Sequence, residues 1–107
     1  MDGRVLDQLF DTIMARRDAA TDSSWTAKLL ANAPELPARK LGEEVTETII
    51  EAMKGDAPAL TKEAADVIYH LLVLMAASGV TPKDVWAELD RRTAQSGLDE
   101  KASRPKG

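Results

Sequence analysis

Two pairs of carboxylates at three-residue spacing are the residues of this chain best suited to chemistry. Glu44 and Glu47 form one pair, and Glu63 and Asp66 form the other. Residues i and i+3 of a helix lie on one face, so each pair presents its oxygens in one direction. Two such pairs on neighbouring antiparallel helices would offer hard oxygen ligands to one point, as Mg²⁺ and Mn²⁺ prefer. A divalent cation between two helices of a bundle is therefore one expectation.

The surroundings of Asp66 leave other interpretations open. Residues 64–75 are apolar almost all round a helix, which predicts that this helix is buried on most sides. A carboxylate buried there must be paired, protonated or metal-bound. Asp66 can therefore pair with a Lys or Arg, or with His70 one turn later, instead of a cation. The acids of residues 43–51 are, on their own, more typical of a solvated helix face than of a metal site. A di-iron site is disfavoured, because it normally uses two Glu-x-x-His motifs and the chain has one His.

Apolar periodicity predicts helices along nearly the whole chain, and these must position the carboxylates. A first helix is expected over residues 5–14, a short one from near Trp25, and a long one over 38–54, after a connection at 32–37. Thr61 is the predicted N-cap of a fourth helix ending near Ser78, and Thr81 is that of a fifth. We find no β-alternation. The expected fold is a single all-α domain over residues 1–107, a four-to-five-helix bundle, with about 96–107 as a flexible basic tail.

Composition excludes several function classes. The chain has 107 residues and a formal net charge of -4, so there is no basic excess with which to bind nucleic acid. It has no cysteine, which removes disulfides, thiolate zinc sites and cysteine nucleophiles. The N-terminus lacks the pattern of a signal peptide, and the apolar stretch over residues 64–80 is too short and polar to span a bilayer comfortably. A soluble cytoplasmic protein without membrane or nucleic-acid partners is expected.

A magnesium ion held by carboxylates usually serves a phosphate substrate, so positive side chains should surround the site. Each of these is, by itself, more typical of a surface charge. Trp25 and Trp86 are expected to serve packing, and Trp25 is the better placed of the two to touch a base. His70 has two open interpretations, a core histidine bonded to Asp66 or a group that contacts substrate or supports a ligand. The positively charged side chains that could contact phosphate are Lys28, Lys40, Arg91, Arg92, Lys101 and Arg104.

The motifs resemble one enzyme superfamily. Glu43-Glu44-x-x-Glu47 followed by Glu63-x-x-Asp66 resembles the signature of the MazG-like all-α nucleoside-triphosphate pyrophosphohydrolases. Three further segments make the chain similar to the phosphoribosyl-ATP pyrophosphatase family within it, and the resemblance extends from Leu6 to Arg104. They are residues 24–29 (SWTAKL), the Tyr69-His70 continuation, and residues 100–104 (EKASR). Trp25 is a departure, because the family more often has Tyr there, so a role for a phenol hydroxyl is lost.

This resemblance implies the Mg²⁺-dependent hydrolysis of phosphoribosyl-ATP to phosphoribosyl-AMP and pyrophosphate, the second step of histidine biosynthesis. It implies Glu44, Glu47, Glu63 and Asp66 as metal ligands, with Glu43 supporting a ligand or positioning water. It also implies a homodimer, and in the family the basic tail would close over phosphates. Two alternatives remain, a house-cleaning hydrolase of free nucleoside triphosphates and a non-catalytic helical interaction module. The module predicts carboxylate pairs more than about 10 Å apart, too far to share one cation.

Overall fold

The described part of the chain, residues 3–94 of the computed structural model, is built from helices alone. In sequence order these are α1 (Arg4–Ala15), α2 (Trp25–Ala31), α3 (Glu35–Lys54), α4 (Ala57–Ala77) and α5 (Pro82–Thr93). The predicted all-α helical fold is confirmed for these residues. The predicted basic tail, including Lys101 and Arg104, lies outside them.

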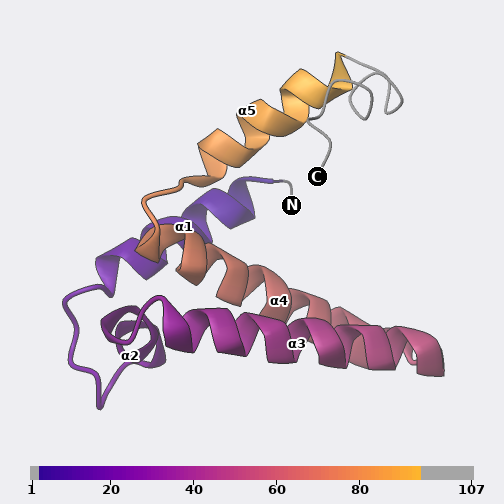
Figure 1. Cartoon of the computed structure of the whole chain (residues 1–107), viewed down its shortest axis with the longest axis horizontal. Helices are drawn as coiled ribbons and strands as arrows, with labels where there is room; N and C mark the ends of the chain where they lie inside the picture. Colours follow the sequence, from indigo (N-terminus) through magenta and orange to yellow (C-terminus); the bar gives the residue numbers. More distant parts are fainter. Residues whose placement is uncertain (1–2, 95–107) are drawn as a thin grey trace, which may run out of the picture.

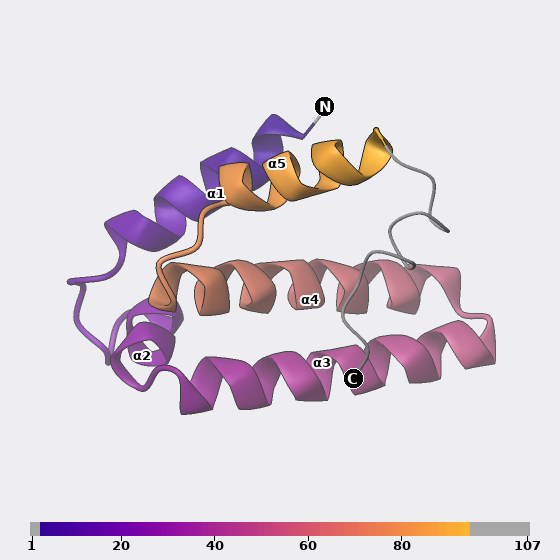
Figure 2. The same cartoon turned by 45° about the horizontal axis from the view of Figure 1, so that its top comes forward.

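The longest helices, α3 and α4, run side by side as an antiparallel pair (Figures 1 and 2). Helix α2 lies at the end of this pair where α3 begins and α4 ends. Helix α1 packs on α4, and α5 packs on α1 after a bend of 108° from α4. Within the described residues no single helix is long and apolar enough to cross a membrane; α4 and α5 meet that test only together, across the bend.

The hydrophobic core lies at one end of the molecule, where α1, α2 and the second half of α4 meet. Leu29 and Val73 are fully buried at its centre. It is completed by Phe10, Ile13, Leu72 and Ala76. The core therefore fixes α2 against α4, while the opposite end of the α3–α4 pair projects beyond it (Figure 2).

Within one chain, the predicted burial of the fourth helix on most sides is wrong. Ile68 and Leu71 of α4 are 41% and 42% exposed, and Asp66 is exposed as well. On α3, Ile49 is 58% exposed and Met53 84%. An apolar pattern predicts that side chains are buried, but it does not distinguish burial within the same chain from burial against another chain. We call the following residues the apolar surface of the α3–α4 pair: Val45, Ile49, Ile50, Met53, Ile68 and Leu71.

Helix α3 begins at Glu35, three residues before the predicted start. Pro37, assigned from sequence to the connection, lies in the first turn and is fully buried. Proline fits there because the N–H groups of a first turn have no partner within the helix. The predicted stop at Gly55 is confirmed, with a φ of 76° in the left-handed region that favours glycine.

Helix α4 begins at Ala57, so the prediction of Thr61 as its N-cap is wrong. Asp56 is the cap, and its Oδ1 accepts from the Ala59 N–H at 3.0 Å. Thr61 lies within the helix and donates to the Ala57 carbonyl at 2.9 Å. At α5 the predicted start is confirmed as a capping box, because the Thr81 N–H donates to Asp84 and the Asp84 N–H donates to the Thr81 hydroxyl.

Candidate active site

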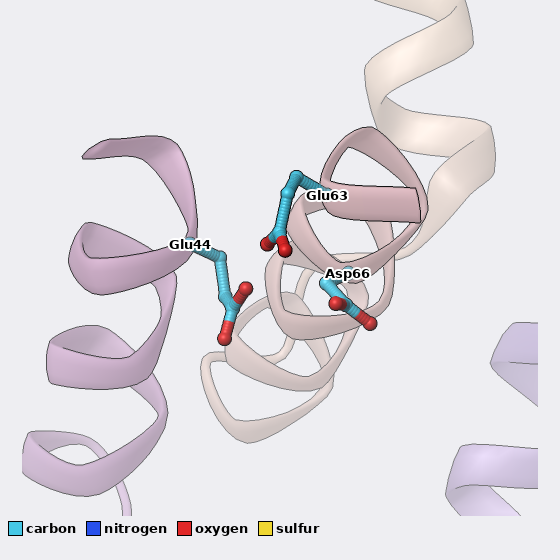
Figure 3. A group of neighbouring side chains, drawn as sticks. All are labelled: Glu44, Glu63 and Asp66. Atoms are coloured by element: carbon cyan, nitrogen blue, oxygen red, sulfur yellow. The ribbon is translucent and has the colours of Figure 1, made fainter. Parts of the chain in front are cut away.

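Three carboxylates from two helices converge on one point. Glu44 comes from α3, and Glu63 and Asp66 come from α4 (Figure 3). One oxygen of each lies within 4.8 Å of the others. An octahedral Mg²⁺ keeps adjacent oxygens about 3 Å apart and opposite ones about 4 Å apart. The three oxygens are thus near the spacing that one ion needs, and their side chains would have to turn further toward one another to bind it. Their position between helices follows from the antiparallel pairing of α3 and α4.

The carboxylate cluster forms no ion pair with a Lys or Arg among the described residues. The Oε2 atom of Glu63 is buried and has no hydrogen-bond partner in that part of the chain. The neighbouring Glu44 carboxyl raises the pKa of Glu63, with burial and the charge of Asp66 adding to the effect. Glu63 in turn is the main cause of a raised pKa at Glu47. A buried, unpartnered carboxylate oxygen among acids is the donor set that a divalent cation fits.

The raised pKa values give the chain without metal a definite pH dependence. The pKa values of Glu47 and Glu63 are raised from their ordinary value of 4.5. At pH values above about 4.5, the folded state therefore binds more protons than the unfolded state. The cluster's contribution to the free energy of unfolding should therefore fall as pH rises through the raised pKa values. Urea denaturation in chelator from pH 4.5 to 7.5 measures this.

A Glu63→Gln variant provides the control for that measurement. Glutamine keeps the size of the side chain but removes one of the interacting acids, so the loss of stability toward neutral pH should become shallower. An unchanged pH profile in the variant would mean that these carboxylates do not repel one another in the folded chain.

The remaining acids of the motif lie beside the three that converge. Glu47 lies one turn after Glu44, and its pKa is raised mainly by the neighbouring Glu63 carboxyl. Glu43 is exposed and forms an ion pair with Lys40 at 3.3 Å. This agrees with the helical geometry, which turns Glu43 about 100° away from Glu44.

A cleft of about 710 Å³ lies between α2 and the first turns of α3. Trp25 is 44% exposed in its wall, and the ammonium groups of Lys28 and Lys40 each lie 5.8 Å from the centroid of its ring. The structure thus brings together three residues that the sequence nominated for substrate. Sequence reasoning missed Arg39 and Asn32, which also line the cleft. The available signal was the position of Arg39, directly before Lys40 on the helix that carries the acids.

Contacts across the core hold α2, and with it one wall of the cleft. The Ser24 hydroxyl caps the helix by accepting from the Ala27 N–H at 3.1 Å. Thr26 and the Tyr69 hydroxyl are hydrogen-bonded at 2.5 Å, which ties α2 to α4. Trp25 and Lys28 therefore project from a helix that is capped at its start and hydrogen-bonded to α4.

His70 is buried, at 6% exposure. Its Nδ1 lies 2.8 Å from the backbone carbonyl of Asp66, one turn earlier, rather than from the Asp66 carboxylate. A carbonyl oxygen only accepts, so Nδ1 carries the proton. The ring packs edge-on against Tyr69 at 4.9 Å, and Nε2 has no partner among the described residues. The location matches the core interpretation of this histidine.

The structure does not bring Arg92 to the carboxylates. It lies on α5, which diverges from α3 (Figure 1), and its guanidinium donates to Glu88 at 3.1 Å. Glu88 also accepts from Arg91, and the two arginines lower its pKa to about 2. Both arginines are thus engaged by one carboxylate on their own helix.

Comparison with known proteins identifies the family. A family model described as phosphoribosyl-ATP pyrophosphohydrolase matches residues 6–93. A protein named phosphoribosyl-ATP pyrophosphatase from Dinoroseobacter shibae is 61% identical over 100 residues, 94% of this chain and 98% of the relative. Proteins of the same name from Ruegeria pomeroyi and Parvibaculum lavamentivorans are 58% and 54% identical, each over 103 residues and 96% of this chain; the alignments cover 98% and 94% of the relatives. The chain belongs to the phosphoribosyl-ATP pyrophosphohydrolase family.

Proposed function

We propose that this chain hydrolyses phosphoribosyl-ATP to phosphoribosyl-AMP and pyrophosphate, the second step of histidine biosynthesis. The observation that carries the proposal is the convergence of Glu44, Glu63 and Asp66 within 4.8 Å, in a chain of this family. Phosphoric anhydride hydrolysis needs negative charge to be neutralised as the pyrophosphate leaves, and a cluster of acids can do this only through a cation.

We infer that the cation is Mg²⁺, held by Glu44, Glu63 and Asp66, with Glu47 as a fourth ligand or a partner of Glu63. When bound, it supplies charge neutralisation at the phosphate oxygens and lowers the pKa of a bound water. Glu43, which is paired with Lys40, would orient water or support a ligand. Supporting groups of this kind commonly fix the direction of metal-bound carboxylates.

The substrate is proposed to occupy the cleft next to the carboxylates. Lys28 and Lys40 would neutralise phosphate charge, and Trp25 would offer its face to the base. His70 would act from within the core, by fixing the backbone at Asp66. For Arg92 a substrate contact requires that it leave Glu88, and the roles proposed for Lys101 and Arg104 concern residues outside the described range.

We further infer a homodimer located in the cytoplasm, as suits a biosynthetic enzyme. The apolar surface of the α3–α4 pair supports the dimer, because monomeric proteins rarely leave so many large apolar residues uncovered on one pair of helices. The most natural cover is the same pair from a second copy, since most oligomers are symmetric. The carboxylates lie on these two helices, so the active site would border the subunit interface.

Pyrophosphate release from phosphoribosyl-ATP tests the proposal. The purified chain is assayed with Mg²⁺ and again with excess chelator, with ATP and dCTP as parallel substrates. We expect release from phosphoribosyl-ATP, its loss in chelator, and recovery when Mg²⁺ is restored. Release mainly from the free nucleotides would instead indicate a house-cleaning hydrolase. No release from any of the three substrates would contradict the proposed enzymatic function.

A non-catalytic helical interaction module predicts that the carboxylate pairs of α3 and α4 lie too far apart to share one ion. This prediction is wrong. One oxygen each of Glu44, Glu63 and Asp66 instead lies within 4.8 Å of the others. Such an arrangement of acids is costly unless a ligand uses it.

A further inference from the structure

The cleft between α2 and α3 carries positive charge that the described part of the chain does not neutralise. Lys28, Arg39 and Lys40 line it, against a single acid, Glu35. Lys40 is paired with Glu43, but Lys28 and Arg39 make no ion pair with any described residue. In a chain of net charge -4, this is a local reversal of sign. It favours an anionic ligand in the cleft.

The form of the cleft suits an organic phosphate. Its volume of about 710 Å³ lies within the range of small-molecule sites, roughly 300–1,000 Å³. One wall is helix α2, and the ammonium groups of Lys28 and Lys40 each lie 5.8 Å from the centroid of its Trp25 ring. An arginine offers a planar fork of donors to a phosphate, and a lysine adds a point charge. Arg39 and Lys28 together provide both.

The cleft lies beside the carboxylate cluster, and none of Glu44, Glu63 and Asp66 lines it. Arg39 precedes Glu44 by five residues, which is about 7.5 Å along the axis of α3. A nucleotide whose triphosphate is held at the carboxylates could therefore extend a second anionic group into the cleft. Phosphoribosyl-ATP has such a group, because its extra ribose carries a 5-phosphate that ATP lacks.

We propose that the cleft binds the 5-phosphate of the phosphoribosyl group, with Arg39 and Lys28 as the residues that distinguish this substrate from ATP. The inference rests on the proposed function and adds which end of the substrate binds at the carboxylates and which end binds in the cleft. The carboxylates serve the end that is cleaved, and the cleft serves the end that stays with the product.

Calorimetric titration of the full chain with two nucleotides, both in chelator, tests this assignment. Phosphoribosyl-AMP and AMP share the adenosine and its phosphate and differ only by the phosphoribosyl group. The wild type should bind phosphoribosyl-AMP more tightly. Arg39→Gln should weaken the binding of phosphoribosyl-AMP about tenfold, because one charge-assisted contact is lost, and the binding of AMP by less than about twofold. Lys28→Gln should act in the same direction.

A matched substitution outside the cleft, Arg16→Gln at the exposed end of α1, should leave both affinities unchanged. Circular dichroism checks that each variant keeps its helices. If Arg39→Gln weakens the binding of both nucleotides equally, the cleft contacts a part that they share, and the proposal is wrong. If it weakens neither, the cleft does not bind this ligand.

Turnover separates this inference from the proposed function. Arg39→Gln should raise KM for phosphoribosyl-ATP with kcat within about twofold, as expected for a contact made equally in the ground and transition states. A wild type that releases no pyrophosphate would contradict the proposed function itself. A wild type that does, together with an unchanged KM and unchanged affinities in Arg39→Gln, would overturn only the role of the cleft.

Discussion

Replacing Asp66 by Asn should lower pyrophosphate release by more than about 100-fold, because removing even a group that only supports a metal ligand typically costs about 10–100-fold. Asp66 is one of three carboxylates within reach of a shared ion, and an amide oxygen carries no charge to hold it. The measurement is kcat/KM for phosphoribosyl-ATP over a series of Mg²⁺ concentrations.

The same substitution should leave the chain without metal as stable as the wild type, or more stable. The charge of Asp66 contributes to the raised pKa of Glu63, so its removal relieves repulsion among the acids. Wild type should gain thermal stability when Mg²⁺ is added, in proportion to the logarithm of its concentration above the Kd, and Asp66→Asn should not.

The control is Asp11→Asn, the same change at an exposed position of α1. It should alter neither turnover nor the response to Mg²⁺. A large loss of stability in chelator for Asp66→Asn would indicate a structural salt bridge at Asp66 in place of a metal ligand. Full activity in that variant would remove Asp66 from the site altogether.

Ile49→Glu should convert a dimer into single chains of 11.6 kDa. Ile49 is 58% exposed within one chain, so a glutamate there is hydrated in the monomer and should change its folding little. In a dimer that covers this surface, the same charge would be buried without a partner, at a cost of roughly 3–5 kcal/mol. That cost weakens association by more than about 100-fold. Sedimentation across a concentration series measures the mass.

Activity should fall together with the dimer, because the carboxylates of α3 and α4 border the proposed interface. The conservative variant Ile49→Val keeps the surface apolar and should retain both the dimer and turnover. Circular dichroism distinguishes a folded monomer from an unfolded chain. A wild type that sediments at 11.6 kDa would contradict the dimer, and a fully active Ile49→Glu monomer would mean that one chain completes the site.

Local features of the fold were readable from sequence because their causes lie within a few residues. The 3.6-residue apolar period predicted the helices, and the Thr81–Asp84 capping box and the stop at Gly55 follow from hydrogen bonds and backbone freedom inside one turn. The errors at the starts of α3 and α4 are also local. Pro37 is assigned from sequence to a connection, but it lies within the first turn of α3, as Pro58 does in α4, and proline is tolerated there.

The residue types and their spacing define the chemistry available to this protein: two pairs of carboxylates on helices, no cysteine, and basic and aromatic residues that could contact a phosphate compound. The packing of α3 on α4 brings Glu44 together with Glu63 and Asp66 while Glu47 lies outside that group of three, and the packing of α2 brings Arg39 and Lys28 into one cleft. The rotation and register of α3 against α4 decide these contacts. They depend on packing between residues far apart in the chain, which a helical period read along one segment does not encode.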